Sequence, residues 1–387
     1  MRFLYIILFI ISCSRGDSAS SDSRVSSFLY TVFSVFDQRK MVKNITENIM
    51  YPWYKDLDSK TKDLRDSILS LSDSCGGNTS NLDSTRKKWK DAFAVLKQTE
   101  VFQIGPSTIF SQVDSWPAQY TLNPPNTGSI NSFISGTGTI GETEIAARPD
   151  SETGFTAIEY ILYDSGSGSS ILSDVCSVLT GRRKSYLQEI SKLTYNRAAL
   201  LAYRWNPALI PSSSTNYGYY MQNPGIPESS YLTMKAVRDD LILNMDNLLE
   251  KIKDDKLGYP AGLSVSSGGT VRPDYRESRF SDNSATDILN NILGFETFYT
   301  SGAESSFSML TAYYNPELNG KIIKKISEVK SSLSLLNTFK SDLNSGNRTN
   351  IQTVMTKVGE LRALIKTDLS NALGSSGSSS GSGGDGD

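Results

Sequence analysis

Apolar residues recur at helical spacing along most of this 387-residue chain. In each of several segments, steps of three, four or seven residues align one apolar stripe, which is typical of an amphipathic helix. The segments with such a stripe are residues 25–71, 82–99, 173–205, 229–253, 284–299, 316–336 and 351–373. Strand-like alternation is almost absent. The pattern therefore predicts an all-α protein, with Pro52 kinking or dividing the first helix.

The segments between the helices divide the chain into two units. Residues 206–227 contain four prolines and three tyrosines, which favours a linker there. The chain is also long enough for two cores of ordinary domain size. We therefore expect two helical-bundle domains with long irregular loops, the first at residues 37–205 and the second at residues 206–373.

Residues 117–153 form a long segment rich in Gly, Pro, Ser, Thr and Asn, with little periodicity. Long structureless connections are uncommon inside compact domains and are often functional. We expect this segment to wall a site, although a plain surface excursion explains its composition equally well.

The two ends of the chain differ in composition from a folded domain. Residues 1–12 have the pattern of a signal peptide, with Arg2 before an apolar run that is too short to span a bilayer. Residues 10–13 look like a bacterial lipobox, so Cys13 is the predicted lipidated first residue of the mature protein. An ordinary signal peptide with a chance cysteine is the alternative. Residues 13–36 would be a flexible tether, and the Gly, Ser and Asp tail at 374–387 would be disordered.

These end segments predict the location of the protein. A lipid on Cys13 would anchor the chain to a membrane of the bacterial cell envelope, on the outer membrane and facing the periplasm or the surface. Cys75 and Cys176 would then lie in an oxidising compartment, where they form one disulfide or remain as two buried thiols. There is no Cys-x-x-Cys spacing, which excludes a zinc knuckle of that kind.

The composition excludes two classes of function. The net charge is −2, and the basic cluster at residues 182–184 lacks interleaved aromatics, so we expect no nucleic-acid partner. The sequence has no Gly-x-Ser-x-Gly element and no histidine to activate a serine, which argues against a serine hydrolase.

Residues 154–163 read Gly-Phe-Thr-Ala-Ile-Glu-Tyr-Ile-Leu-Tyr and stand between the two helical halves. Their apolar residues recur at helical spacing, so Gly154 would lie at or before the start of a helix. Thr156 and Glu159 are three residues apart, which places both side chains on one helical face, close enough to share a ligand. Such a pair is a familiar way to offer two groups to a metal.

This stretch resembles the signature of the imelysin-like family, also called insulin-cleaving metallopeptidase-like proteins, which reads Gly-x-His-x-x-Glu. The resemblance extends to Trp89, to Phe-x-x-Gly-Pro at residues 102–106, to Asp-x-Trp-Pro at residues 114–117 and to Glu-x-x-Phe-Ser at residues 277–281. It covers roughly residues 37 to 373. Thr156 stands where the family has its histidine. The chain contains no histidine at all, so none can serve elsewhere as a zinc ligand or as a base near neutral pH.

The resemblance implies a cleft between two bundles, and it links the chain to proteolysis or to iron-related uptake. Mapped onto this sequence, the ligand or metal set would be Thr156, Glu159, Asp114 and Glu277. The pocket around it would include Trp116, Arg279, Ser281 and Tyr160, although for Trp116 core packing is the simpler expectation.

Several functions agree with this mapping. A non-catalytic lipoprotein could bind a hard cation, such as calcium, magnesium, manganese or iron, through oxygen ligands that suit zinc poorly. Alternatively, Arg279 could neutralise Glu159 or Glu277 and leave a polar pocket for a small ligand without a metal. A working metallopeptidase would need Glu159 as its base. A structural or adhesive surface protein would need neither a metal nor a ligand pocket. Glu159 could also be purely structural, as a buried carboxylate that holds the bundles together.

Overall fold

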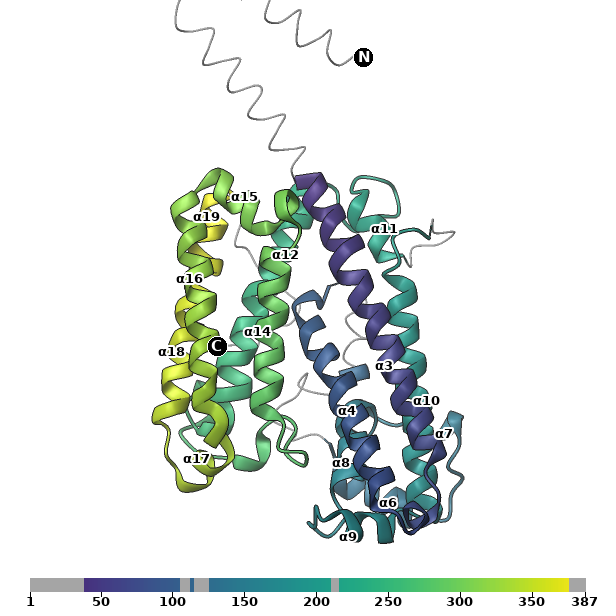
Figure 1. Cartoon of the computed structure of the whole chain (residues 1–387). Helices are drawn as coiled ribbons and strands as arrows, with labels where there is room; N and C mark the ends of the chain where they lie inside the picture. Colours follow the sequence, from purple (N-terminus) through teal and green to yellow (C-terminus); the bar gives the residue numbers. More distant parts are fainter. Residues whose placement is uncertain (1–37, 105–111, 115–124, 210–215, 376–387) are drawn as a thin grey trace, which may run out of the picture.

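The computed structural model describes residues 38–104, 112–114, 125–209 and 216–375. All secondary-structure elements in these residues are helical, which confirms the predicted all-α class (Figure 1). None of the described helices is both long enough and apolar enough to cross a membrane. Cys13, the predicted lipidated residue, and Trp116, a predicted pocket residue, lie outside the described residues. So do the predicted signal peptide (1–12), the predicted tether (13–36) and residues 376–387 of the predicted tail.

Three long helices build the first half. They are α3 (Tyr51–Ser70), α4 (Thr79–Thr99) and α10 (Gly181–Arg204), and α3 packs against both others. Shorter helices lie around their lower ends in Figure 1: α6 (Thr127–Ser135), α7 (Glu142–Ala146), α8 (Gly154–Tyr163) and α9 (Leu172–Val178). A π-helix, η1 (Ile45–Met50), precedes α3, and Pro52 falls in the first turn after it.

The second half is a group of helices beside the first (Figure 1). Its main members are α12 (Met234–Glu250), α14 (Ser284–Thr300), α16 (Pro316–Ser332) and α18 (Thr349–Ala363). The π-helix η6 (Lys251–Gly258) and α13 (Tyr259–Ala261) extend α12. Smaller helices complete it: α15 (Phe307–Tyr314), η10 (Leu333–Thr338), α17 (Phe339–Ser345), η11 (Leu364–Leu369) and α19 (Ser370–Ala372).

Two features bear on the expected boundary between domains. α11 (Tyr217–Gln222), which follows the predicted linker, packs against η1 of the first half. The buried apolar side chains of both halves also join into one continuous cluster. The division into two independent domains therefore stays a prediction.

Three expectations about local structure were wrong. The segment 117–153 contains α6 and α7, and α6 begins because Asn126 caps it by accepting from Ser129 N at 3.1 Å. The helix expected over 173–205 is broken between α9 and α10, where Gly181 has a φ of +49°. The helix expected to end near residue 253 continues through η6 to Ala261, and Gly262 in the left-handed region ends it.

A disulfide joins Cys75 to Cys176, so the structure decides between the two alternatives left open by the sequence. The bond connects η2 (Asp73–Gly77) to α9 and closes a span of 101 residues. Such a crosslink restricts the unfolded chain more than the folded one, which stabilises the fold. It therefore holds the elements that flank α8.

The two halves touch most closely where α14 crosses the end of α4. A Cβ added to Gly294 of α14 would lie 2.3 Å from Gln98 O, so only a glycine permits this approach. At the same place, Gln98 Nε2 donates to Asn290 Oδ1 at 3.1 Å. The contact fixes the distance between the halves.

Replacing Gly294 with alanine should therefore destabilise the protein by about 1–3 kcal/mol, the usual range for overpacking a tight contact. Gly320→Ala is the matched control, because Gly320 also lies within a helix, α16, but its added Cβ meets nothing within 4 Å. That variant should gain up to about 1 kcal/mol from helix propensity. Urea unfolding of both variants measures the difference, and equal effects would contradict a close contact at Gly294.

Candidate functional site

The signature helix α8 lies inside the protein. All ten of its residues are buried, and α4, α9 and α10 pack around it. Gly154 begins the helix with a φ of +70°, a conformation that a side chain disfavours. Trp89 of α4 donates from Nε1 to Phe155 O at 3.0 Å. The glycine and the tryptophan of the family pattern thus both serve to seat this helix.

Glu159 connects α8 to the second half. Its Oε1 accepts from Phe280 N at 3.1 Å, from Ser281 N at 2.8 Å and from Ser281 Oγ at 2.7 Å. Burial raises the pKa of Glu159 to about 7, although the hydrogen bonds from Ser281 and the charge of Arg279 act in the opposite direction. The Glu159 carboxylate therefore binds a segment of the second half directly.

Residues 276–283, which we call the anchor loop, are shaped for this contact. Ser278 and Asp282 both adopt positive φ values, 50° and 56°, which non-glycine residues rarely do. Asn283 N closes the turn by donating to Ser278 O at 3.3 Å. Strain of this kind persists only where the surroundings enforce it. Here it turns two successive backbone N–H groups toward Glu159.

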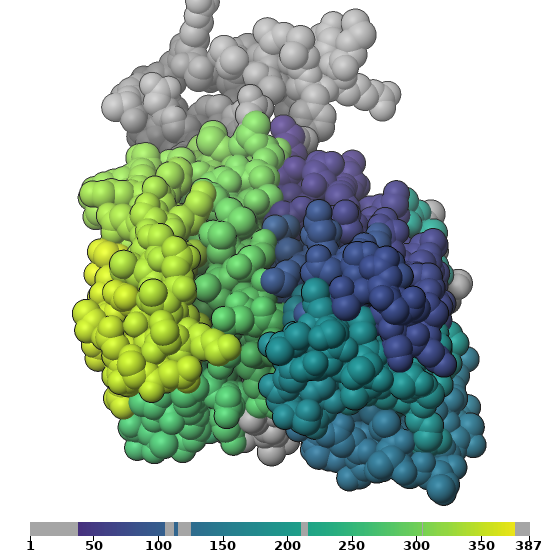
Figure 2. Space-filling view, turned by 60° about the horizontal axis from the view of Figure 1, so that its bottom comes forward, coloured from purple at the N-terminus to yellow at the C-terminus, as the bar shows by residue number. Residues whose placement is uncertain are grey.

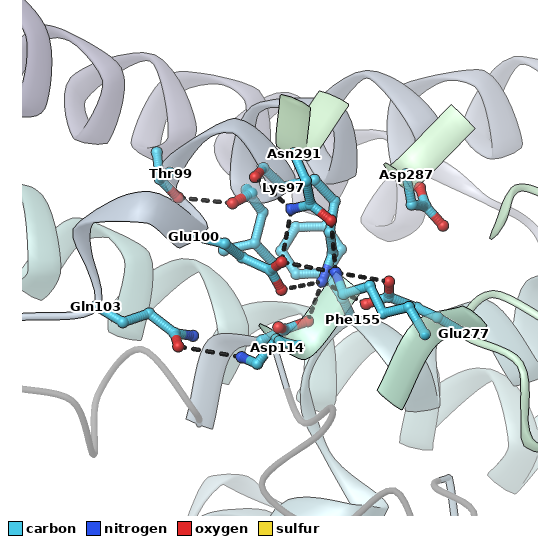
Figure 3. Close-up of polar contacts among 12 residues, drawn as sticks. Lys97, Thr99, Glu100, Gln103, Asp114, Phe155, Glu277, Asp287 and Asn291 are labelled. Carbon is cyan, nitrogen blue, oxygen red and sulfur yellow. Dashed lines mark hydrogen bonds and ion pairs between the residues drawn. The ribbon is translucent and has the colours of Figure 1, made fainter. Parts of the chain in front are cut away.

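A second set of charges, which we call the ion cluster, lies between the halves (Figure 3). Lys97 Nζ, at the end of α4, donates to Glu100 Oε1 at 2.8 Å, to Asp114 Oδ1 at 2.8 Å and to Glu277 Oε1 at 2.6 Å. All four side chains are almost completely inaccessible to solvent. Glu277 comes from the anchor loop, so the cluster also crosses the interface.

Lys256 of η6 supplies a second ammonium group. Its Nζ lies 2.6 Å from Glu100 Oε2 and 2.9 Å from Glu277 Oε2, and it donates to Asn291 Oδ1 at 2.7 Å. Asn291 of α14 in turn donates to Glu100 Oε2 at 2.6 Å and to Lys97 O at 2.7 Å. Glu100 and Glu277 therefore each have both ammonium groups beside them.

The protonation of the ion cluster follows from these neighbours. Burial raises the pKa of Asp114 well above its usual value; the charge of Lys97 opposes this shift, and the charges of Glu100 and Glu277 add to it. Burial acts against Lys97 and Glu100 as well, but their partners of opposite charge prevail, so the pKa of Lys97 is raised and that of Glu100 is lowered.

The carboxylates of Glu100, Asp114 and Glu277 are close enough to form a metal site, since one oxygen from each lies within 4.8 Å of the others. The donor set does not fit a metal here, because Lys97 Nζ already occupies the space between the same oxygens. A cation would have to enter beside two buried ammonium groups. The ammonium groups take the role that a metal ion has in an all-oxygen site.

The predicted ligand set is therefore divided in the structure. Asp114 and Glu277 meet in the ion cluster, whereas Glu159 binds Ser281 of the anchor loop. Thr156 is buried on α8, and its Oγ1 has no hydrogen-bond partner among the described residues. The expected metal ligation by these four residues stays a prediction that the geometry does not favour.

Sequence reasoning missed Lys97, Glu100 and Lys256. Lys97 and Glu100 continue the spacing of the apolar stripe on α4, four and seven residues after Phe93. Charged residues at such inward positions signal a buried ion pair. No comparable signal marks Lys256, because the π-helical turns of η6 change which residues face inward.

Beside the anchor loop, residues of both halves line an open cleft with a volume of about 520 Å³. The first half contributes Asn131, Tyr160 and Asp164, and the second contributes Arg276, Arg279 and Lys340. The rings of Tyr160 and Phe280 lie 5.1 Å apart in its wall. Figure 2 shows the seam between the halves on this face of the molecule. Of the predicted pocket residues, Tyr160 and Arg279 line this cleft.

The fold and this site define an all-α protein built around a buried signature helix at the contact of two helical halves. A family model described as Imelysin (Peptidase M75) matches residues 50–367. The chain therefore belongs to the imelysin family, as the resemblance suggested.

Similar proteins agree with this assignment. Iron-regulated protein A of Synechococcus elongatus is 23% identical over 278 residues, which cover 70% of this chain and 68% of that protein. The crystal structure of a putative iron-regulated protein A precursor from Parabacteroides distasonis has a TM-score of 0.72 at 19% identity, covering 88% of this chain and 94% of the other. An imelysin-like protein from Psychrobacter arcticum has a TM-score of 0.64 at 14% identity, covering 88% and 96%. These two structures show a shared fold.

Removing the Lys97 ammonium group should destabilise the protein strongly. Lys97→Met leaves buried carboxylates without their shared cation, and breaking a buried pair from one side costs about 3–5 kcal/mol. Lys324→Met is the control, because Lys324 is 79% exposed and its nearest carboxylate oxygen is 4.0 Å away; it should change stability by less than about 0.5 kcal/mol. Chemical unfolding measures both, and similar values would show that the ion cluster contributes little.

Glu159 should make the stability depend on pH. Its pKa rises from 4.5 to about 7 on folding, so the folded state binds this proton more tightly than the unfolded state. The resulting stabilisation is complete below about pH 4.5 and is lost as the pH rises through about 7, with a total of about 3 kcal/mol. The difference in unfolding free energy between the wild type and Glu159→Gln should therefore fall from pH 5 to pH 8.

The control for this titration is Glu142→Gln, since Glu142 is exposed in the first turn of α7. Its difference from the wild type should stay constant over the same pH range. A constant difference for Glu159→Gln as well would mean that Glu159 is already ionised throughout.

Proposed function

We propose that this chain is a non-catalytic binding lipoprotein of the bacterial cell envelope, which holds an iron-related ligand in the cleft between its two halves. The observation that carries the proposal is the pairing of the site's acidic groups. Glu159 accepts three hydrogen bonds from the anchor loop, and Lys97 fills the space between the other carboxylates. Because these acidic groups already have partners, the part of the site that is open to a ligand is the cleft.

Peptidase chemistry requires a Lewis acid with an open position and a base that can reach water. A pKa of about 7 would suit Glu159 as a base, but its side chain is only 1% exposed and its Oε1 is engaged. The chain also contains no histidine. These three facts support a binding role over hydrolysis.

The iron-related part of the proposal is supported by the relatives named above, two of which are described as iron-regulated protein A or its precursor. The envelope part is supported by the lipobox-like residues 10–13 and the apolar run before them. Mass spectrometry of the N-terminal peptide from the mature protein would test the lipid on Cys13, and an unmodified cysteine would refute it.

Filling the cleft should abolish the biological role while leaving the fold intact. Asn344 is exposed on α17 and lines the cleft, whereas its neighbour Ser345 is exposed but does not line it. In a strain that lacks the gene, growth should slow only when iron is scarce. The wild type and Ser345→Trp should restore growth, and Asn344→Trp should not.

Other results would favour other functions. Growth that is independent of the gene at every iron level would remove the iron role and favour a structural or adhesive surface protein. Cleavage of a mixed peptide substrate by the purified, tag-free chain, abolished by a chelator, would instead identify a working metallopeptidase.

A further inference from the structure

The walls of the cleft differ in charge. Arg276, Arg279 and Lys340 all come from the second half, while Asp164 and Asp274 are the acidic residues that line the same space. Asp164 is nearly buried, and its Oδ1 accepts from Gly166 N at 2.6 Å and from Gly168 N at 3.3 Å. This carboxylate is therefore occupied by its own loop. The three cationic side chains exceed the two carboxylates that line the cleft by one charge.

Arg276 is paired with Asp282, whose Oδ1 lies 3.6 Å from Nη2, but one of its donor atoms lacks an acceptor among the described residues. Its Nη1 and Nη2 donate to Pro273 O at 2.8 Å and to Arg279 O at 3.0 Å. Only 5% of Arg276 is exposed, yet its buried Nε has no hydrogen-bond partner in the described part of the chain. A buried donor without an acceptor is costly. Because this atom is inaccessible, an oxygen atom of a ligand would relieve that cost only if the guanidinium turned toward the cleft.

Arg183 adds positive charge behind the opposite wall. Its guanidinium lies 5.2 Å from the centre of the Tyr160 ring, and Nη2 donates to Asp164 O at 2.6 Å. Its Nε, like that of Arg276, is buried without a partner among the described residues. Arg183 does not line the cleft, so it adds charge behind the wall, whereas Arg276 and Arg279 line the cleft itself and suit carboxylate ligands.

A bare iron cation does not fit this environment. Three cationic and two acidic side chains line the cleft, and this excess of positive charge repels the ion on approach. The carboxylates that could have ligated it, those of Glu100, Asp114 and Glu277, already surround Lys97 Nζ. Iron would have to enter with enough anionic groups around it to reverse its charge.

We propose that the cleft binds an anionic polycarboxylate chelate of ferric iron, and this inference rests on the proposed function. Arg279 and Lys340 contact the outer carboxylates of the chelate, and Arg276 faces them from the anchor loop. The cleft volume of about 520 Å³ falls within the range of roughly 300–1,000 Å³ that small-molecule sites occupy. Glu159 takes part only indirectly, because it holds the loop that carries both arginines.

The test compares three iron probes of different charge by isothermal titration calorimetry, using the tag-free chain from Ser14 onward. Ferric citrate is the anionic probe, a ferric trihydroxamate chelate with a positive charge is the matched chelate, and ferrous ion under anaerobic conditions is the bare cation. We expect binding of ferric citrate alone, weakened at high salt because the contacts are partly exposed.

Charge reversal at one lysine distinguishes the effect of the cleft on binding from the effect of the protein's overall charge. Lys340 is exposed and lines the cleft, so Lys340→Glu should weaken ferric citrate binding at least tenfold. Lys324→Glu makes the same change in net charge on α16, outside the cleft, and should weaken binding less than twofold. Circular dichroism of both variants checks that they are folded.

The outcomes distinguish this inference from the proposed function. If the cationic chelate or the ferrous ion binds as well as ferric citrate, and Asn344→Trp blocks that binding, the cleft is an iron site but its preference for anions is refuted. Equal binding by Lys340→Glu and the wild type also refutes it. Binding of no probe would overturn the inference, and unimpaired growth of the deletion strain when iron is scarce would separately overturn the iron role.

Discussion

The fold depends on a buried network of ion pairs between its two halves. Lys97 and Glu100 come from the end of α4, Lys256 and Asn291 come from the second half, and Glu277 comes from the anchor loop. Taking ions out of water is costly, and the cost is recovered only when the partners keep a close geometry. The ion cluster therefore tolerates few relative positions of the halves. The close contact of Gly294 with Gln98 acts in the same direction, since the backbones can approach only where no side chain intervenes.

The cleft is a consequence of that arrangement. The ion cluster holds the anchor loop through Glu277, and α8 holds it through Glu159. Between these two attachments the chain adopts positive φ at Ser278 and exposes Arg279 at the seam. The strained residue Ser278 and the cleft residue Arg279 thus share the short stretch between the two attachments. This distribution is usual for binding loops, because the strain is paid by the contacts that flank it.

Much of the fold could be predicted from helical periodicity, because buried stripes on α3, α4 and α18 follow directly from the spacing of apolar residues. The helices α6 and α7 escaped prediction because they are short and depend on a cap such as Asn126 more than on periodicity. At the site, the family motifs pointed to Asp114, Glu277 and Glu159 as ligand residues, and all three are buried in the structure. They could not show which of these pair with one another, since Lys256 reaches the cluster through π-helical turns that no apolar pattern marks.

The structure also explains how the signature can keep its glutamate after losing its histidine. In this chain, Glu159 satisfies two backbone N–H groups and a hydroxyl of the anchor loop, and removing it would leave those donors buried without an acceptor. Thr156, at the histidine position, has no such task, since its hydroxyl lacks a partner among the described residues. The two positions are therefore under different constraints. A glutamate in this motif can be required by the fold alone, so its presence is not evidence of peptidase chemistry. The residue at position 156 is not required by the fold in this way, so its identity is the better indicator of that chemistry.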